Sequence, residues 1–492
     1  MNQLSINIQT TVRLLLLLLF CTLTASAKIT LPDIMGDNMV LQQQTQAQLW
    51  GKAAPGSTIQ ITAGWTDQRF TTQVDNDGIW LAKVATPVAS KQEYTLTISE
   101  ILKNTESPSD RIELKRILIG EVWFASGQSN MEMPLEGFWN CPVKNNNEVI
   151  ATAAENPWIR VAPIEKNGKT KPVEEVPGKW QVPSPATAPA MSATGYFFAQ
   201  MLQKALDIPV GVIACAWGGS RVEGWTPEEV VRTYDDVDID KEWTSGWNGS
   251  WWHYNTPVIM YNGMLHPLRH YTIRGFLWYQ GESNVGKETT YPTRLKTMVD
   301  IWRKEFGGTT DSMPFYLVEI APWGGYGEWL SSPLFRECQH HAADIIGNSG
   351  CISTNDLVEP YEINQIHPAE KREVGYRLAY MALNRTYGFK SIACDSPEYD
   401  HMEIHGNQIE VFFKYAEQGL SPWQDIQGFE IAGDDGKFVP AQAKLNESNK
   451  SILVWAGAVP APKNVRYCFK SFQIGNLKNA RNLPVVPFRT DK

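Results

Sequence analysis

Ser129 is the residue of this sequence whose surroundings favour nucleophilic chemistry most strongly. It follows an apolar, β-forming run over 117–125, which predicts a fully buried strand, and a Ser-Gly turn at 126–127. Residues 128–131 then open a short predicted helix. A strand that stops at such a turn presents the next side chains at the carboxyl edge of a sheet, where open α/β sheets place their chemistry. The same spacing also fits a serine that only caps the helix.

A serine nucleophile needs a general base, and His367 is the best placed of the eight histidines. It follows a predicted strand that ends at 355–356 and a short loop, and Pro368 suits the first position of a predicted helix over 369–387. The imidazole is therefore expected at a helix entry above the strand ends. No His-Glu-x-x-His or comparable cluster indicates zinc.

Acyl transfer also needs donors for the negative charge that develops on the substrate oxygen. The loop 216–220 (Ala-Trp-Gly-Gly-Ser) follows a predicted strand, and its glycines allow backbone N–H groups to approach a ligand closely. The loop 278–284 (Trp-Tyr-Gln-Gly-Glu-Ser-Asn) follows the next strand and brings two side-chain amides to the same edge. Each loop alone is a weak signal, but in succession with Ser129 and His367 they indicate one catalytic edge.

The composition is that of a folded globular protein and argues against two classes of partner. The chain has 492 residues, of which 43% are hydrophobic and 20% charged, an ordinary balance. Its net charge is −9 and it has no basic run, which argues against nucleic acid or an anionic membrane surface as partner. Its 19 tryptophans and 17 tyrosines have planar faces that suit sugar rings, although most of them will serve the core.

Residues 1–27 have the features of a secretory signal peptide. Arg13 precedes an apolar stretch over 14–20 that is too short to span a bilayer, and Ala-Ser-Ala follows at 25–27. We expect cleavage after Ala27 and a soluble mature protein, secreted or periplasmic, without membrane contact. Cys21 does not indicate lipidation, because a phenylalanine is a poor residue before a lipidated cysteine.

Six of the seven cysteines follow this segment, and they have no metal-type spacing. They are Cys141, Cys215, Cys338, Cys351, Cys394 and Cys468. Disulfide pairing cannot be read from the sequence. Cys215 lies in an apolar predicted strand and is expected to be a buried thiol.

The secondary-structure pattern divides the rest of the chain into three parts. Residues 28–115 contain short β-prone runs separated by turn residues, which indicates a β-sandwich module. From 116 to 390 apolar strands alternate with amphipathic helices, which predicts a parallel sheet with helices on both faces. Residues 391–492 return to a β pattern and are expected to form a second small β domain. The stretch 226–265 is rich in Trp and Tyr without clear periodicity. We expect it on the substrate side, where its aromatic residues either bind the substrate or serve packing.

Within the α/β part, the expected strands and helices have definite ranges. The strands are 210–216, 273–279, 315–320 and 351–354, and the helices are 193–206 and 294–306.

Four motifs in this order make the sequence resemble a known family. Gly-Gln-Ser-Asn-Met at 127–131, Trp-Gly-Gly-Ser at 217–220, Gln-Gly-Glu-Ser-Asn at 280–284 and Ile-His-Pro at 366–368 resemble the sialate O-acetylesterases, within the SGNH hydrolase superfamily. The resemblance covers nearly the whole mature chain, 29–491. It implies a flavodoxin-like esterase domain that removes O-acetyl groups from sugars without a metal or cofactor.

The resemblance also implies roles for individual residues. Ser129 matches the family nucleophile and His367 its general base. The backbone N–H groups of Ser129 and Gly219, together with the side chain of Gln280, match the oxyanion-hole positions. Asn284 competes with Gln280 for the third of these positions.

The sequence departs from the family pattern at the acid of the triad. The superfamily usually has an aspartate two or three residues before the histidine, where this chain has Asn364 and Gln365. Either a Ser-His dyad works with a carbonyl or amide that holds the imidazole, or another acid substitutes. Asp356 and Glu362 are the nearest candidates, and Glu359 is a weaker one. Loss of the acid from a full triad can cost orders of magnitude in rate.

The expected reaction is two-step acyl transfer on an O-acetylated sugar or glycan. Ser129 gives its proton to His367 and attacks the acetyl carbonyl, the sugar hydroxyl leaves, and water then frees acetate. Glu282 has no role as base once the histidine is placed, and we expect it to order its loop. Arg221 either meets a sialic acid carboxylate or pairs with Glu223 to order the loop.

Two other functions stay open at this stage. One is the same chemistry on an acetylated plant polysaccharide such as xylan or pectin. The other is a carbohydrate-binding protein whose esterase site has decayed, which the missing acid favours and the retained serine, histidine and glycine loops oppose. The sequence does not define the oligomeric state.

Overall fold

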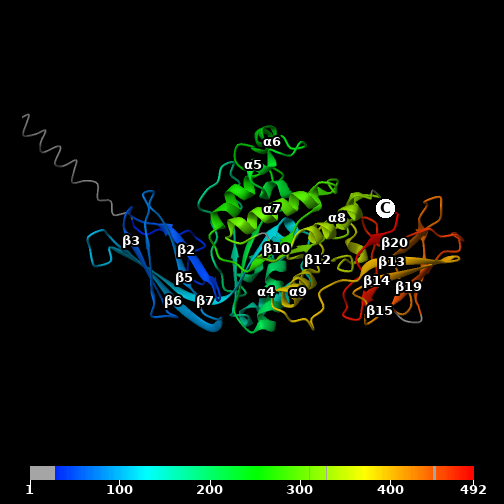
Figure 1. Ribbon diagram of the computed structural model, residues 1–492, viewed down its shortest axis with the longest axis horizontal. Helices are drawn as coiled ribbons and strands as arrows, with labels where there is room; N and C mark the ends of the chain where they lie inside the picture. The colour runs from blue at the N-terminus through cyan, green and yellow to red at the C-terminus, as the bar shows by residue number, and fades with distance from the viewer. Residues whose placement is uncertain (1–27, 310, 329, 447–449, 492) are drawn as a thin grey trace, which may run out of the picture.

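The structure is a computed structural model that describes residues 28–309, 311–328, 330–446 and 450–491. The expected signal peptide lies outside these residues. Three regions follow one another along the long axis of the molecule: a β-rich region at the N-terminal end, a central region with helices around a sheet, and a second β-rich region (Figure 1). None of the helices in the described part of the chain has the length and apolar character needed to cross a membrane.

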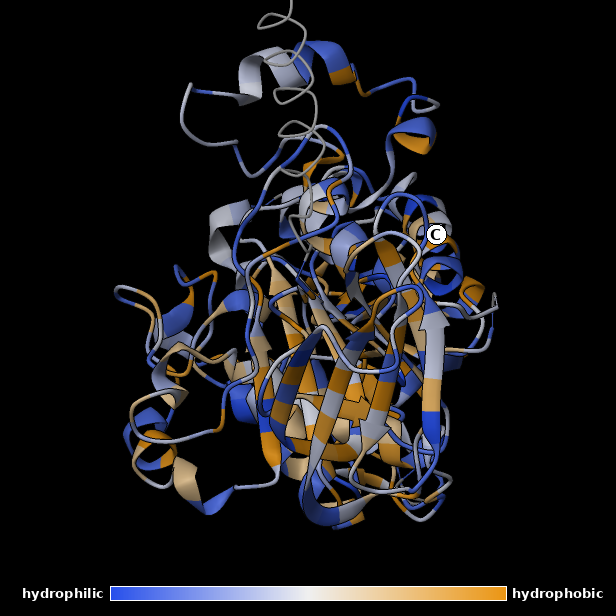
Figure 2. Cartoon of the chain, turned by 90° about the vertical axis from the view of Figure 1, so that its left-hand side faces the viewer, coloured by the Kyte–Doolittle hydropathy of each residue, from blue (hydrophilic) through white to orange (hydrophobic). Residues whose placement is uncertain are grey.

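The N-terminal region consists of β-strands that are mostly antiparallel; the short strand Val40–Gln42 is the exception, because it is fully buried and pairs in parallel with the strand Asp110–Gly127. The strands are β1 (Val40–Gln42), β2 (Gln46–Lys52), β3 (Thr58–Ala63), β4 (Arg69–Gln73), β5 (Ile79–Ala85) and β6 (Ser90–Ile101). β2 pairs with β5, and β4, β3 and β6 form a second sheet. Hydrophobic and hydrophilic segments alternate along these strands in Figure 2, as expected for a sheet with one buried face. The β-prone runs of the sequence in this region, at 40–41, 47–50, 58–62 and 94–98, lie in β1, β2, β3 and β6, whereas β4 and β5 were not predicted.

One long strand, β7 (Asp110–Gly127), connects the N-terminal sheet to the central sheet. Its first half pairs antiparallel with β6. Its second half pairs in parallel with β9 (Val210–Ala216) and β10 (Gly275–Tyr279). The domain boundary predicted at residue 115 therefore falls inside a continuous strand.

The central sheet is parallel and confirms the predicted fold class. Its remaining strands are β8 (Ile159–Pro163), β11 (Phe315–Val318) and β12 (Ser349–Ile352). The strand order is β8-β9-β7-β10-β11-β12. Without the edge strand β8, this is the doubly wound order of flavodoxin-like folds, in which the chain turns to opposite sides of the first strand.

Helices cover both faces of this sheet. The helices are α2 (Ser129–Glu132), α3 (Asn146–Ala151), α4 (Ala193–Leu206), α5 (Glu228–Val231), α6 (Ile239–Gly246), α7 (Tyr291–Glu305), α8 (Ser331–Ile345) and α9 (Lys371–Met381). Phe124 of β7 packs in one core with residues of α7 and α8, whereas its neighbour Trp123 packs in a second core with α4 and α9. Figure 1 shows these two helix pairs on opposite sides of the sheet. The predicted helix 193–206 matches α4, and the predicted helix 294–306 matches α7 within three residues.

The C-terminal region is again antiparallel. Its strands are β13 (Glu398–His405), β14 (Gln408–Lys414), β15 (Leu420–Ser421), β16 (Phe429–Ala432), β17 (Val439–Pro440), β18 (Gln442–Leu445), β19 (Ser451–Trp455), β20 (Asn464–Tyr467), β21 (Lys478–Asn479) and β22 (Phe488–Arg489). Two four-stranded sheets, β13-β14-β19-β18 and β17-β16-β20-β22, share one apolar core.

The six cysteines of the described chain are all free thiols. Cys215 is fully buried in β9, as predicted.

Candidate active site

Ser129 lies at the carboxyl edge of β7, as the first residue of α2. Gly127 turns the chain there with a φ of 136°, and a Cβ at this position would lie 2.2 Å from the carbonyl oxygen of Tyr279. Only glycine therefore fits the turn. The N-cap of α2 is Gln128, and no side chain caps the helix. Ser129 is thus not a capping serine; it is half-buried, and its Oγ makes no hydrogen bond to any described residue.

Two backbone N–H groups beside Ser129 are free. The loop after β9 packs directly on the serine, because a Cβ on Gly218 would lie 3.2 Å from the Cβ of Ser129. Gly219 has a φ of 79°, and a Cβ there would lie 2.4 Å from the ring of Tyr254. Within the described residues, the N–H groups of Ser129 and Gly219 have no hydrogen-bond acceptor. Both are therefore available to a substrate oxygen.

His367 lies in the loop before α9 and is half-buried. Its Nδ1 faces the Sγ of Cys141 at 3.7 Å, and the ring of Phe138 packs edge-on against the imidazole with 5.2 Å between centroids. The described residues show no hydrogen bond between the imidazole and the Oγ of Ser129.

The predicted start of the helix after His367 is wrong. α9 begins at Lys371, and its N-cap is Glu370, whose side chain accepts the N–H of Glu373. Because this carboxylate satisfies a free N–H of the first turn, the helix starts there and Pro368 stays in the loop.

A buried asparagine connects the serine turn to the histidine loop. Asn130 Nδ2 donates to the carbonyl oxygen of Ile366 at 3.1 Å and to Oε1 of Glu282 at 2.6 Å. Its Oδ1 accepts from Nζ of Lys371 at 2.9 Å, and the same ammonium donates to the carbonyl of Pro368 at 2.6 Å. The residues after Ser129 and before His367 are thus held together. Asn130 and Glu282 belong to the predicted motifs, but nothing in the sequence signalled their partner Lys371.

The same cluster sets the charge state of the histidine. Burial, and the charge of Lys371, lower the pKa of His367 to about 4. Burial also lowers the pKa of Lys371 to about 8 and raises the pKa of Glu282 above its ordinary value. The imidazole is therefore neutral at neutral pH and able to accept a proton.

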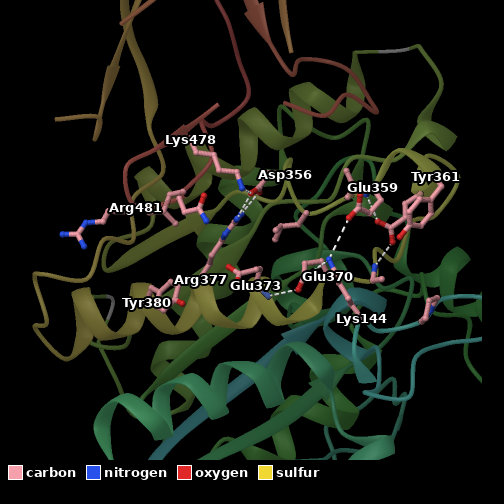
Figure 3. Close-up of a pocket in the computed structure, with 17 residues that line it drawn as sticks. Lys144, Asp356, Glu359, Tyr361, Glu370, Glu373, Arg377, Tyr380, Lys478 and Arg481 are labelled. Carbon is pink, nitrogen blue, oxygen red and sulfur yellow. Dashed lines mark hydrogen bonds and ion pairs between the residues drawn. The ribbon is translucent and has the colours of Figure 1, made fainter. Parts of the chain in front are cut away.

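Asp356, one of the two alternative acids, is engaged away from His367. Its two oxygens form a bidentate ion pair with Arg377, each at 2.7 Å, and Lys478 lies 2.9 Å from the same carboxylate. Figure 3 shows the three side chains converging on one another. Burial raises the pKa of Asp356, but the two cations outweigh it and hold this pKa below its usual value.

Glu362, the other alternative acid, orders the histidine loop through backbone contacts. Its Oε1 accepts the N–H of Ala369 at 2.9 Å, and its Oε2 accepts the N–H of Glu359 at 2.8 Å. Glu359 itself lies 4.0 Å from Lys144. These acids and Asp356 line a cavity of about 570 Å³ (Figure 3), and none of them makes a hydrogen bond to His367 within the described chain.

The two side-chain amides proposed as a third oxyanion donor are also engaged. The Nε2 of Gln280 donates to the carbonyl of Ser220 at 3.0 Å and to Oδ1 of Asn284 at 2.8 Å, so neither of its protons is left for a substrate. The Nδ2 of Asn284 donates to Glu223 at 3.0 Å. Both amides are buried. The structure therefore places them as supports of the glycine loops, and does not bring them to Ser129.

In the described part of the chain, the structure does not show the ion pair between Arg221 and Glu223 that the sequence left open. Glu223, its expected partner, instead pairs with Arg294 at 2.7 Å. The guanidinium of Arg221 has no hydrogen bond or ion pair among the described residues. It lines a cavity of about 240 Å³ together with Ser283 and three carboxylates, those of Glu223, Asp236 and Glu242, and its charge acts on Glu242. This cavity adjoins the glycine loop, because the Oγ of Ser283 donates to the carbonyl of Gly219 at 2.8 Å.

The aromatic stretch 226–265 folds over the same side of the site. Tyr254 contacts Gly219, as described above, and its ring lies against that of His253 with 4.0 Å between centroids and a tilt of 33°. Trp247 and Trp251 of this stretch are largely exposed. Tyr254 is itself exposed, and an exposed aromatic face beside the glycine loop is suited to a sugar ring.

No group with the donor set of a metal site lies in this edge of the described structure. The group of potential metal ligands that the described residues contain is Glu403, His405 and Glu410, on the β13–β14 hairpin of the C-terminal region.

Comparison with known proteins finds esterases that are similar over most of the chain. The chain is 25% identical to human sialate O-acetylesterase, over 85% of this chain and 82% of that protein. It is 24% identical to the mouse protein of the same name, over 92% of each. The crystal structure of a carbohydrate acetylesterase from Xanthomonas citri superposes with a TM-score of 0.80 and 29% identity, covering 94% of this chain and all of that one.

The family model described as carbohydrate esterase, sialic acid-specific acetylesterase, matches residues 119–384. This range is more than half of the chain and includes the serine turn, both glycine-containing loops and the histidine loop. The chain belongs to the carbohydrate esterase family of sialic acid-specific acetylesterases.

Proposed function

We propose that this protein is a carbohydrate O-acetylesterase in which Ser129 is the nucleophile and His367 the general base. The observation that carries the proposal is the hydrogen bond from Asn130 to Ile366, which holds the two residues' loops at one sheet edge. The free N–H groups of Ser129 and Gly219 support an oxyanion hole at the same edge. Membership of the esterase family supports the reaction class.

The reaction proceeds in two acyl-transfer steps. The neutral imidazole of His367 takes the proton of Ser129 Oγ as this oxygen attacks the acetyl carbonyl. The N–H groups of Ser129 and Gly219 stabilise the oxyanion of the tetrahedral intermediate. The imidazolium then protonates the departing sugar oxygen, and a water molecule, deprotonated by the same imidazole, releases acetate from the serine.

We assign the substrate to the O-acetylated sialic acids. The support is Arg221, whose guanidinium is unpaired in a cavity beside the glycine loop, since a planar guanidinium binds a carboxylate bidentately. Arg221 is thus proposed as the residue that binds the sugar carboxylate. The backbone of acetylated xylan is neutral and has no group that requires this cation, whereas pectin carries galacturonate carboxylates that Arg221 could also bind.

The experiment compares acetate release by the intact protein and by Ser129→Ala. The substrates are 9-O-acetyl sialic acid and acetylated xylooligosaccharides. The proposal predicts release that the substitution abolishes, with the higher kcat/KM on the sialic acid. Release that is higher on the xylooligosaccharides would reassign the substrate. No release above the Ser129→Ala background, together with glycan binding, would establish a decayed site.

We also propose that residues 1–27 are a signal peptide and that the protein is exported. The support is the pattern of Arg13, the apolar stretch and Ala-Ser-Ala at 25–27. Intact-mass measurement of the exported protein should give a chain that begins at Lys28. A full-length chain in the cytoplasm would contradict the proposal.

A further inference from the structure

The position that a triad gives to its acid is occupied here by a thiol. In a serine hydrolase, the acid accepts the Nδ1–H of the histidine and so leaves Nε2 unprotonated toward the serine. In this structure, Nδ1 of His367 faces Sγ of Cys141 at 3.7 Å. The same sulfur lies 3.1 Å from Oε1 of Gln365, one of the two positions where the superfamily's aspartate is missing.

The backbone fixes which way the Gln365 amide points. Oε1 lies 3.2 Å from the backbone nitrogen of His367, which can only donate, so this atom must be the acceptor oxygen. Nε2 lies 3.0 Å from the carbonyl oxygen of Asn140, which can only accept, so this atom must be the donor nitrogen. Both contacts require the same orientation of the amide.

The amide orientation in turn fixes the proton of the thiol and then that of the imidazole. Because Oε1 of Gln365 only accepts, the Cys141 S–H must be the donor of that hydrogen bond. The sulfur then offers only lone pairs to His367. Nδ1 must therefore carry a proton, and Nε2 is left with the lone pair that a general base needs.

We propose that Cys141 and Gln365 replace the acid of the triad as positioning residues, which hold His367 in its Nδ1–H form through a neutral relay from Nδ1–H to sulfur and from S–H to amide oxygen. The proposal rests on the proposed function of His367 as base. It deepens that function, since it explains how the site keeps a usable base without a carboxylate.

The loop that carries the thiol is held in place independently of the relay. Phe138 and Cys141 exchange reciprocal backbone hydrogen bonds at 3.0 and 2.9 Å, and the N–H of Lys144 donates to the carbonyl of Ala369 at 2.9 Å. Cys141 is only 8% exposed. The sulfur is therefore fixed beside the histidine.

A neutral relay differs from a carboxylate in one measurable respect. It selects the tautomer, but it adds no negative charge to stabilise the imidazolium. The charged group that acts on the ring is the ammonium of Lys371 on α9, and the facing group from the 138–144 loop is the neutral thiol. The pKa of His367 is accordingly low, about 4.

The direct test is the tautomer of His367 in the full-length protein. Selective ¹⁵N-histidine labelling reports which ring nitrogen carries the proton, and the spectrum of His367→Gln identifies the signal. The proposal predicts a protonated Nδ1 and an unprotonated Nε2 at pH 7. A protonated Nε2 overturns it. This readout needs no turnover, so its failure is distinct from a failure of Ser129→Ala to abolish acetate release.

Three variants test the relay through activity. Cys141→Ala removes the partner of Nδ1 and should lower kcat roughly 10- to 100-fold with little change in KM, the factor that corresponds to one lost hydrogen bond. Cys141→Ser can donate and accept in the same way and should restore most of the loss. Cys338→Ala is the control, because Cys338 has the same 8% exposure in α8 and should leave kcat unchanged.

Gln365→Glu introduces a charge at the end of the relay. A carboxylate there should raise the pKa of the histidine by about one unit or more, so the acid limb of kcat/KM should move to higher pH. The proposal is overturned if the acid limb of kcat/KM in Gln365→Glu stays at the wild-type pH. It is also overturned if Cys141→Ala has the wild-type kcat and pH profile.

Discussion

Asn130 donates a hydrogen bond from its side-chain amide to the carbonyl oxygen of Ile366 across 3.1 Å. The two residues are separated by 236 positions in the sequence and are the immediate neighbours of Ser129 and His367. The same amide contacts Glu282 and Lys371. One buried side chain thus joins the serine turn, the loop after β10 and the start of α9, and it connects the loops that carry the proposed nucleophile and the proposed base.

Asn130→Ala should cost both stability and activity. The substitution leaves the buried charges of Glu282 and Lys371 without their shared partner, so we expect the free energy of unfolding to fall by about 3 kcal/mol. Because the two loops are released from each other, kcat should fall as well. Urea unfolding and acetate release measure the two effects. Asn407→Ala, at an exposed turn, is the control, and equal effects of the two substitutions would contradict the account.

Gly219→Ala should impair catalysis through the oxyanion hole. The added Cβ would meet the Tyr254 ring at 2.4 Å, and the φ of 79° disfavours any side chain, so the loop must move and its N–H is misplaced. Losing one such donor costs about 100- to 1000-fold in kcat. Gly436→Ala has a similar φ of 65° with open space around it. That control should retain the wild-type kcat; a Gly219→Ala enzyme with normal kcat would exclude this donor.

The activity should persist to unusually low pH. The base must be neutral, so activity is lost as the pH falls through the pKa of His367, which lies at about 4 and not at its ordinary 6.5. The pH profile of kcat/KM should therefore stay flat from neutral pH to about pH 5. A loss of activity centred near pH 6.5 would show that burial and the Lys371 charge do not lower the pKa of His367.

The lowered pKa of His367 also makes the stability of the fold depend on pH. The folded pKa lies below the unfolded one, so the unfolded chain binds this proton more readily and His367 destabilises the fold progressively as the pH falls from 6.5 to about 4. His367→Gln should therefore be more stable relative to the wild type at pH 4.5 than at pH 7.5, by thermal unfolding. An identical difference at the two pH values would contradict the shift.

The substitution Asp356→Asn tests whether this carboxylate has a structural or a catalytic role. The carboxylate pairs with Arg377 and Lys478 in a buried cluster, and removing one partner of a buried pair costs about 3–5 kcal/mol. We expect lower stability with an unchanged kcat at 25 °C. A loss in kcat of the order of 10⁴-fold, as for a triad aspartate, would restore Asp356 as the third member.

Arg221→Lys should change substrate preference. A lysine keeps the charge but loses the bidentate fork, so KM for the O-acetyl sialic acid should rise while kcat/KM on acetylated xylooligosaccharides stays the same. Equal effects on both substrates would show that Arg221 orders the loop and does not bind the carboxylate.

The sequence predicted the central sheet well because its strands are local, apolar runs that end at glycine turns. β9 and α4 match their predicted ranges, since each carries its full periodicity within one segment. β7 was predicted only from residue 117, because its first half is half-exposed and its second half fully buried. Because the residues change from half-exposed to buried within this one strand, the sequence pattern indicated a domain boundary at residue 115, where the strand in fact continues.

The site was predicted in part for a similar reason. Ser129, His367 and Gly219 stand in short motifs, and the structure brings their loops to one edge. The engagement of Gln280 by Ser220 and Asn284 could not be read from spacing, because it depends on which way a buried amide points. Cys141 gave no signal, since its contact with His367 spans 226 residues.

The role of Ser129 as nucleophile is tested by covalent labelling of the intact protein with a serine-directed organophosphonate. Tandem mass spectrometry should locate the adduct on Ser129, and acetate release should fall in proportion to the labelled fraction. Ser129→Ala should remain unlabelled. An adduct on another residue, or acetate release that continues after full labelling of Ser129, would show that this serine is not the nucleophile.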